Sequence, residues 1–406
     1  MIENLKVDGF KSLRNFEIKF QKGINVIVGP NGVGKTNICQ ALTILSSLTN
    51  NSLNDAFTQF GGVRSTFNLV DCEQENKKIT VEASGRTIGT FKNQEYDLEF
   101  KYSIELGLSE ELLVNSEVLE VKRKSKQGTY KKVLSIKQDK KTLVAKILDN
   151  ELIGDFSVIK KGEKQFKLEL NESEYESKSF LPLISRFIFV CHLVAREFSK
   201  IKSLNIDPHI ARQACDITEP KEMLGNGKYL ANTLHLLSKK PDDLIEINSI
   251  LEQLLPNFKE IKPEISEISL KRFFSLIDKR RHGFSSNSLS DGTIKLLALL
   301  VGIVRQKEKT TIIEEPENYL HPYANRLLIN YLRDTFDNGV CILTSHSETI
   351  LNLIQPEELI ICELDGSFTT CKRLDNIESI KRVIESSGFG CGYHYIAGNL
   401  GGTPQF

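Results

Sequence analysis

The feature that most constrains this sequence is a glycine-rich loop that lies between a short apolar run and a helix-forming run. Residues 29–36 read GPNGVGKT and fit the pattern G-x-x-x-x-G-K-[ST]. The apolar residues Ile24, Val26, Ile27 and Val28 precede the loop, and residues 38–48 favour a helix, which is the strand–loop–helix context of a phosphate-binding P-loop. Glycine lets backbone N–H groups close around phosphates, and the helix presents its positive end to them. We therefore predict that the chain binds a nucleoside triphosphate, with Lys35 on the β- and γ-phosphates and the Thr36 hydroxyl on Mg²⁺.

The composition is that of a globular protein without a strong overall charge. The chain has 406 residues, of which 40% are hydrophobic and 26% charged, so it can bury a core and can form two or three domains. Its formal net charge is zero, so a nucleic-acid contact would need a local basic surface. No apolar run approaches the roughly 18 residues that span a membrane. Because the sequence also lacks a signal peptide, we expect a cytoplasmic protein that contacts no membrane.

The cysteines are predicted to be reduced thiols. None belongs to a C-x-x-C pair, and none is spaced with the seven histidines as in a zinc site. Eight cysteines in a cytosolic chain of this length are typical of thiols that do not pair. They lie at positions 39, 72, 191, 215, 341, 362, 371 and 391.

The hydrophobic pattern divides the chain into three parts. Residues 1–76 and 265–406 carry the P-loop character and form the predicted nucleotide-binding core. Within residues 77–178 apolar residues alternate with others, most strictly over 96–106, which predicts an antiparallel β-rich insert with one face in water. Residues 179–264 place apolar residues at helical spacing and predict a helical subdomain. The expected fold class is α/β.

A basic run lies in the β-rich insert. Residues 122–146 hold ten Lys or Arg against one acid, Asp139. The run is either a solvated sheet face or a contact to a nucleic-acid phosphate backbone, and the second alternative makes DNA a candidate partner. The ten residues are Lys122, Arg123, Lys124, Lys126, Lys131, Lys132, Lys137, Lys140, Lys141 and Lys146.

A serine–glycine segment precedes a predicted helix in the second half of the chain. Ser290, Asp291 and Gly292 stand directly before the very apolar residues 294–304. Ser290 is a good N-cap, and Asp291 suits the first turn of a helix. By itself this pattern predicts only a capped, buried helix.

Two predicted strands then end in residues that suit phosphate chemistry. The first ends in Glu314 and Glu315. A strand-terminal acid can hold Mg²⁺ through its water shell, and a second acid can orient the attacking water. The next strand, residues 340–343, leads to His346. That histidine is expected at the edge where ligands bind in parallel α/β sheets.

The order of these segments resembles the motif set of ABC-type ATPases. The pieces are KVDGFKSLRN, GPNGVGKTN, LSDGT, EEPENYLHP and TSHSE. Together they look like the RecF/SMC-related branch, and they most resemble the AAA-type ATPases of the OLD (overcoming lysogenization defect) group, which occur in bacterial antiphage systems. The resemblance covers residues 1–70 and 285–355. It implies an ABC-type P-loop NTPase head that carries the β insert and the helical subdomain.

The resemblance also implies a role for each motif residue. Glu314 corresponds to the Walker B acid that binds Mg²⁺ together with Thr36. Glu315 corresponds to the catalytic glutamate and His346 to the switch histidine that faces the γ-phosphate, with Lys35 as the third catalytic residue. The residues expected on ATP are Asn31, Gly32, Val33, Gly34, Lys35, Thr36 and Asn37, together with Ser290 and Gly292 of the signature loop.

In this family the signature loop touches the γ-phosphate held by a second copy, so ATP joins two copies head to tail. Gln59 is a candidate for the Q-loop glutamine. Two positions depart from the pattern of transporters, which have Asp where this chain has Glu314 and Gly where it has Asp291. OLD-like relatives share both departures, so we expect an active site.

The motif set predicts an ATPase that dimerises around ATP and regulates a separate effector, most simply a nuclease, in antiphage defence. Only 60 residues follow His346, which is too few for the Toprim nuclease domain of OLD nucleases. The alternative is a RecF-like DNA-repair ATPase that binds DNA and loads repair partners. A scaffold with structural ATP is disfavoured by the acid pair, and a transporter subunit by both the acid-pair motif and the β insert.

Overall fold

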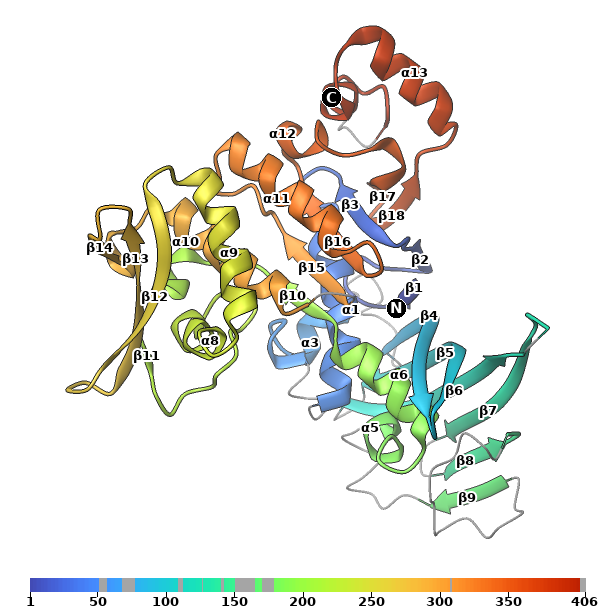
Figure 1. The fold of residues 1–406 in the computed structure, drawn as a ribbon. Coiled ribbons are helices and arrows are strands. Elements are labelled where there is room, and N and C mark those ends of the chain that lie inside the picture. The colour runs from blue at the N-terminus through green and yellow to red at the C-terminus, as the bar shows by residue number, and fades with distance from the viewer. Residues whose placement is uncertain are drawn as a thin grey trace. The chain divides into compact units, whose positions relative to one another are not determined.

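The computed structural model describes residues 1–50, 57–67, 77–108, 112–125, 127–139, 142–149, 165–169, 179–306 and 309–401. The chain forms two compact units, and neither is one continuous segment. Figure 1 labels their helices and strands. The first unit comprises residues 1–21, 30–201 and 361–372, and the second comprises residues 22–29, 202–360 and 373–406. The predicted core, insert and helical subdomain have other boundaries than these two units, and that division stays a prediction.

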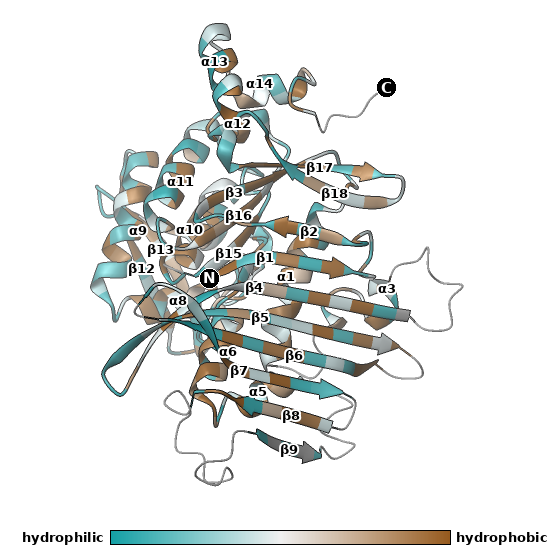
Figure 2. Ribbon diagram, turned by 90° about the vertical axis from the view of Figure 1, so that its right-hand side faces the viewer, coloured by the Kyte–Doolittle hydropathy of each residue, from teal (hydrophilic) through white to brown (hydrophobic). Residues whose placement is uncertain are grey.

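The first unit is built on an antiparallel sheet with the strand order β2-β1-β4-β5-β6-β7-β8-β9. Buried and more exposed residues alternate along β5, because successive side chains of a strand point to opposite faces. Figure 2 shows the same alternation of hydrophobic and hydrophilic residues along these strands. The prediction of an antiparallel β region is therefore confirmed. The strands are β1 (Ile2–Asp8), β2 (Phe16–Lys19), β4 (Lys77–Phe91), β5 (Gln94–Leu108), β6 (Leu112–Lys124), β7 (Tyr130–Asp139), β8 (Thr142–Ile147) and β9 (Gln165–Glu169).

The N-terminal strands belong to this sheet. The sequence predicts two short strands before the P-loop, and β1 and β2 are these strands. β1 pairs with β4, with Val7 opposite Val81, so the start of the chain extends the sheet of the insert. The alternation of apolar residues within β1 predicts a strand, but it does not specify the distant strand with which β1 pairs.

Helices of the first unit pack on this sheet and on one another. They are α1 (Lys35–Asn50), α3 (Val63–Thr66), α5 (Phe180–Ile184) and α6 (Phe189–Ser199). α6 contacts both α1 and β4. Phe198 of α6 places its ring edge against Phe100 and Tyr102 of β5, at centroid distances of 5.7 and 5.1 Å. Burial of these rings ties the helix to the sheet and so supports the helix that follows the P-loop.

A buried carboxylate joins the sheet to the start of α5. Glu117 of β6 accepts hydrogen bonds from Ser179 Oγ at 2.6 Å, from Tyr102 Oη at 2.7 Å and from the Phe180 N–H at 2.8 Å. Its side chain is fully buried, and burial raises the pKa of Glu117 to about 7, against the hydrogen bonds that lower it.

The second unit contains a parallel sheet in which β10, β15, β16 and β3 are neighbours in that order. The strands are β10 (Lys202–Leu204), β15 (Thr310–Glu314), β16 (Val340–Ser345) and β3 (Gly23–Val28). All residues of β16 are buried, as are five of the six residues of β3, as expected of parallel strands that are covered on both faces. In the register, Glu314 lies opposite Thr344, and Ser345 lies opposite Val28. The carboxyl ends of β15, β16 and β3 therefore meet at one edge of the sheet.

An antiparallel group and several helices complete the second unit. The antiparallel strands are β11 (Cys215–Asp216), β12 (Phe258–Ser266), β13 (Lys271–Asp278) and β14 (Gly283–Ser285). The helices are α7 (Pro208–Ala211), α8 (Leu230–Leu237), α9 (Pro241–Leu254), η2 (Ser286–Ser288), α10 (Asp291–Val304), α11 (Pro322–Thr335), α12 (Glu348–Leu351), η3 (Pro356–Glu358), α13 (Ile377–Ser387) and α14 (Cys391–Ile396). Among the described residues, no helix is both long enough and apolar enough to cross a membrane.

The prediction that every cysteine is reduced is wrong for two of them. Cys362 of β17 (Leu359–Asp365) and Cys371 of β18 (Phe368–Arg373) form a disulfide, with Cα atoms 4.3 Å apart. β17 and β18 are neighbouring strands, and their register brings the two thiols together, which spacing along the chain does not reveal. Cysteines 39, 191, 215, 341 and 391 are buried and take part in no disulfide within the described part of the chain. Cys72 lies outside the described residues.

Candidate functional site

The P-loop of the first unit has the backbone that phosphate binding requires. Gly32 and Gly34 adopt φ angles of +80° and +99°, which side chains other than glycine rarely take. Lys35 is the first residue of α1, and its ammonium group donates to the Pro30 carbonyl at 2.9 Å. Thr36 in the first turn is exposed, so its hydroxyl is accessible to a ligand. The predicted strand–loop–helix context is therefore present.

A network of side-chain hydrogen bonds supports the P-loop. Thr369 of β18 donates its hydroxyl to the Val33 carbonyl at 2.7 Å, and its hydroxyl also lies 2.6 Å from Ser12 Oγ. Asn37 donates to Ser12 Oγ at 2.8 Å. A Cβ added to Gly34 would lie 2.1 Å from Thr369 Oγ1, so only glycine fits there. Sequence reasoning missed Thr369 because nothing near it in the chain signals contact with the P-loop.

Gln59, the candidate Q-loop residue, also lies in the first unit. Its amide donates to Ser47 Oγ of α1 at 2.8 Å. This bond places the side chain beside the helix that follows the P-loop. Its role as the Q-loop glutamine stays a prediction.

The acid pair lies at the carboxyl edge of the second unit's parallel sheet. Glu314 is the last residue of β15, and Ser203 Oγ lies 3.4 Å from its Oε1. Glu315 follows with φ of +44°, a left-handed conformation that is uncommon for a residue with a side chain. Its N–H donates to the Thr344 carbonyl at 3.0 Å, and its carbonyl accepts from Lys295 Nζ at 2.9 Å. These two bonds hold Glu315 in a conformation that is strained by itself.

His346 faces the acid pair from the neighbouring strand. It follows β16 directly, and its Nδ1 lies 3.7 Å from Glu315 Oε1. The side chains of His346 and Glu315 are 47% and 40% exposed, so a substrate can reach both. Asn318 donates to the other oxygen of Glu315 at 2.8 Å. The structure thus brings the predicted glutamate and histidine together, at the edge where β3 ends in Val28.

The signature segment begins α10. Ser290 is the N-cap: its Oγ accepts from the Thr293 N–H at 3.2 Å and it is exposed. A Cβ on Gly292 would lie 2.5 Å from the Tyr319 carbonyl oxygen, so this glycine permits close contact between α10 and the loop that follows the acid pair. The free N–H groups of the first turn can bind an anion, as the predicted signature role requires.

Arg212 organises the segment before the signature helix. Its Nη1 donates to the carbonyls of Ser286, Asn287 and Leu289 at 3.4, 3.2 and 3.2 Å, and its Nη2 pairs with the Asp291 carboxylate. Asp291, where transporters have glycine, thus serves as an ion-pair partner. Sequence reasoning missed Arg212 because it lies on the C-cap of α7, far from the motif in the chain.

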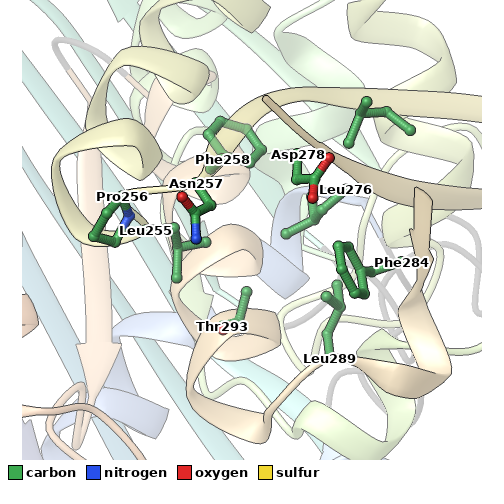
Figure 3. A pocket seen from close by; sticks show the side chains of 10 residues that line it. Leu255, Pro256, Asn257, Phe258, Leu276, Asp278, Phe284, Leu289 and Thr293 are labelled. Carbon is green, nitrogen blue, oxygen red and sulfur yellow. The ribbon is translucent and has the colours of Figure 1, made fainter. Parts of the chain in front are cut away.

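An apolar pocket of about 270 Å³ lies beside the signature helix (Figure 3). Residues that follow α9, residues of β12, β13 and β14, and the start of α10 line it, and Asp278 is its charged residue. The remaining lining is mostly apolar, with Leu255, Phe258, Leu276, Phe284 and Leu289 as examples. Because no lining side chain is cationic, this pocket does not suit a triphosphate.

The expected Mg²⁺ ligands are of the right chemical kind. The Thr36 hydroxyl and the Glu314 carboxylate are hard oxygen donors, which Mg²⁺ prefers, and few protein ligands suffice because phosphates and water complete its shell. No group of three or more His, Cys, Asp or Glu side chains suited to a metal is found among the residues that the structure describes.

Several residues of the basic run are paired with acids, most of them on adjacent strands. Lys122 contacts Glu99 at 3.3 Å, Arg123 contacts Asp149 at 3.1 Å, Lys124 contacts Asp97 at 3.4 Å and Lys132 contacts Glu120 at 2.5 Å. Such pairs reduce the local positive field and favour the solvated sheet face over a phosphate contact. Lys126, Lys140 and Lys141 lie outside the described residues, and the DNA contact stays a prediction.

Comparisons with known proteins match most of the chain to one protein family. The family model described as "AAA domain, putative AbiEii toxin, Type IV TA system" matches residues 24–352. A protein named ATP/GTP phosphatase from Helicobacter pylori is 20% identical, over 94% of this chain and 95% of that protein. Septu protein PtuA of Bacillus thuringiensis is 24% identical, over 90% of this chain and 76% of that protein. Retron Vc95 probable ATPase of Vibrio cholerae is 22% identical, over 90% of this chain and 74% of that protein.

A shorter match concerns the DNA double-strand break repair Rad50 ATPase of Methanopyrus kandleri. It is 50% identical over 44 residues, which is 11% of this chain and 5% of that protein. Among solved structures, an SMC head bound to the C-winged helix domain of ScpA has a TM-score of 0.49 and 14% identity, and the match covers 94% of this chain and 99% of that one.

Proposed function

This chain belongs to the family described as "AAA domain, putative AbiEii toxin, Type IV TA system", and on that premise we propose that it hydrolyses ATP at a site shared by two copies. One observation carries the proposal. The carboxyl ends of three adjacent parallel strands bring Glu315 and His346 to the edge at which β3 leads into the P-loop. Ligands bind at this edge in open α/β sheets.

Each residue has a distinct part in the proposed reaction. Lys35 binds the β- and γ-phosphates, and Glu315 orients the attacking water and accepts its proton. His346 faces the γ-phosphate from the next strand, and Ser290 presents the N-terminus of α10 to the γ-phosphate held by the second copy. When bound through Thr36 and Glu314, Mg²⁺ neutralises charge on the phosphate oxygens.

Substitution of Glu315 tests the reaction. Glu315→Gln keeps the size of the side chain but cannot accept the proton, so hydrolysis should fall roughly 100-fold or more while ATP still binds. The measurements are phosphate release and binding of ATP by calorimetry. Glu378→Gln, which removes an exposed carboxylate from α13, is the matched control and should hydrolyse ATP normally. Normal turnover by Glu315→Gln would refute the role of Glu315.

The shared site is tested by mass in solution. Ser290 and Gly292 are useful to a nucleotide only if a phosphate arrives from another copy. Glu315→Gln with ATP and Mg²⁺ should therefore double in mass by light scattering, and Ser290→Arg in the same background should remain at the mass measured without ATP. A mass that does not depend on ATP would contradict the shared site.

We further propose that the ATPase controls a separate effector protein, most simply a nuclease, in antiphage defence. The support is the OLD-like motif set and the likeness to proteins named Septu protein PtuA and Retron Vc95 probable ATPase. An adjacent gene for an HNH nuclease, a Toprim-like protein or a reverse transcriptase, whose product co-purifies with this chain, would identify the effector. Full antiphage protection by this chain alone would contradict the proposal.

The second candidate is a RecF-like DNA-repair ATPase, in which the basic run would contact DNA. Phosphate contacts give binding that weakens steeply as salt rises. DNA binding is therefore measured against salt with duplex, gapped and single-stranded DNA. The slope should flatten when Lys122, Arg123, Lys124, Lys131 and Lys132 are neutralised if the insert is the contact. An unchanged slope would exclude the insert.

A further inference from the structure

We propose that the carboxylate of Glu317 is a positioning group that holds His346 in place for hydrolysis. The inference rests on the proposed function, in which His346 acts at the γ-phosphate. Glu317 lies two residues after the catalytic glutamate, and sequence reasoning assigns it no role.

Glu317 connects the loop after β15 to the loop after β16. Its Oε1 accepts a hydrogen bond from Ser345 Oγ at 2.6 Å and one from the His346 N–H at 3.3 Å. The same oxygen lies 4.0 Å from His346 Nδ1. One carboxylate oxygen therefore binds the backbone of His346 and the side chain of Ser345, and it lies close to the imidazole ring.

Glu317 is itself held firmly. Its side chain is 8% exposed, in contrast to the 47% of His346. Two turns fix its backbone, because the Asn318 N–H donates to the Glu315 carbonyl at 3.3 Å and the Leu320 N–H donates to the Glu317 carbonyl at 3.0 Å. Because the carboxylate of Glu317 is buried and restrained, it can fix the orientation of the more exposed His346 side chain.

The negative charge of Glu317 needs an explanation that hydrogen bonding does not supply. A neutral amide could accept the same two bonds, and burial of a carboxylate is costly unless a cation compensates it. Lys295 is that cation: burial lowers its pKa, while the carboxylates of Glu317 and Glu315 oppose the change. In the part of the chain that the structure describes, Glu317 Oε2 is buried without a hydrogen-bond partner. One oxygen of the buried carboxylate is thus left without a hydrogen bond, while the other faces Ser345 and His346.

The chemical consequence concerns the orientation of the imidazole ring. Glu315 Oε1 and Glu317 Oε1 lie 3.7 and 4.0 Å from His346 Nδ1. Nδ1 therefore faces two carboxylates, and Nε2 is the nitrogen presented to a ligand. Glu317 thus sets both the position of the ring and the nitrogen that it presents.

The test is Glu317→Gln, which preserves size and one acceptor oxygen but removes the charge. We expect kcat for ATP hydrolysis to fall roughly 10- to 100-fold, as misplacement of a reacting group does, while ATP affinity stays within about twofold. Glu358→Gln is the matched control. Glu358 is a half-buried carboxylate of the same unit, 2.9 Å from Arg333, and its loss should leave kcat unchanged.

A double-mutant cycle separates positioning of His346 from a general loss of structure. In a His346→Ala background, Glu317→Gln should reduce kcat by no more than about twofold, because its target is gone. Full kcat in Glu317→Gln, or an equal loss with and without His346, would overturn the proposal.

A readout that is independent of turnover separates this proposal from the proposed function. The ring signals of His346 in an NMR spectrum are identified by their absence in His346→Ala. They should shift in Glu317→Gln and stay in place in Glu358→Gln. If the wild-type chain hydrolyses no ATP, the proposed function fails, yet shifted ring signals still support the positioning. Unmoved signals in Glu317→Gln overturn it.

Discussion

The buried carboxylate of Glu117 makes a quantitative prediction about pH and stability. Its pKa is raised by burial from 4.5 to about 7. Below pH 4.5 the group is protonated in the folded and the unfolded chain, so the folded chain bears no cost. Between pH 4.5 and 7 the unfolded chain loses the proton while the folded chain keeps it, so the free energy of unfolding falls as pH rises. Above pH 7 the loss is complete.

The magnitude follows from the two pKa values. Each unit between them corresponds to roughly 1.4 kcal/mol, so the interval from 4.5 to about 7 amounts to about 3 kcal/mol of stability lost by pH 8. No discount for solvent screening applies, because the group is fully buried. A loss of this size is a large part of the stability of an ordinary domain.

The assay is urea unfolding followed by circular dichroism at pH 5, 6, 7 and 8. Wild type is compared with Glu117→Gln, which cannot ionise and should lack this component of the pH dependence. Glu120→Gln is the matched control: it removes an exposed carboxylate from the same strand, where Glu120 pairs with Lys132, and should follow wild type. Equal pH dependence of wild type and Glu117→Gln would refute the reasoning.

Three further substitutions test the loops of the site. Gly34→Ala should lower ATP affinity roughly tenfold or more in calorimetry, because its Cβ would lie 2.1 Å from Thr369 Oγ1 at a φ of +99°; normal affinity would contradict this. Thr369→Val removes the donor 2.7 Å from the Val33 carbonyl and should lower stability by about 1–3 kcal/mol in thermal unfolding, whereas Thr369→Ser should restore it. Arg212→Gln should weaken ATP-dependent dimerisation in light scattering while ATP binding stays normal, because Arg212 holds the signature segment and Asp291; unchanged dimerisation would exclude that role.

Local patterns in the sequence predicted much of the fold and several site residues. The P-loop is a contiguous motif whose glycines, lysine and threonine act within eight residues, so its backbone could be predicted without the rest of the chain. Strict alternation over residues 96–106 predicted β5, and Ser290 before an apolar run predicted the N-cap of α10. The P-loop, the strand β5 and the N-cap of α10 each depend on residues that are close together in the sequence.

Strand pairing in the tertiary structure decided the remaining features. The disulfide between Cys362 and Cys371 joins the neighbouring strands β17 and β18, and most of the acids that pair with the basic run lie on strands adjacent to it. A shift of one residue in register would turn these side chains to the other face. Because register is set by the packing of the whole sheet, the charge of a segment alone does not reveal its partners.

The same distinction holds within the site. A triphosphate-binding loop, an acid pair and a histidine in a fixed order can be recognised along the chain. In contrast, the folded chain is needed to see that Thr369 supports the P-loop, that Arg212 organises the signature segment and that Glu317 contacts His346. These supporting residues act through hydrogen bonds between segments far apart in the chain. Such bonds form only after the strands have assembled, so no local pattern records them.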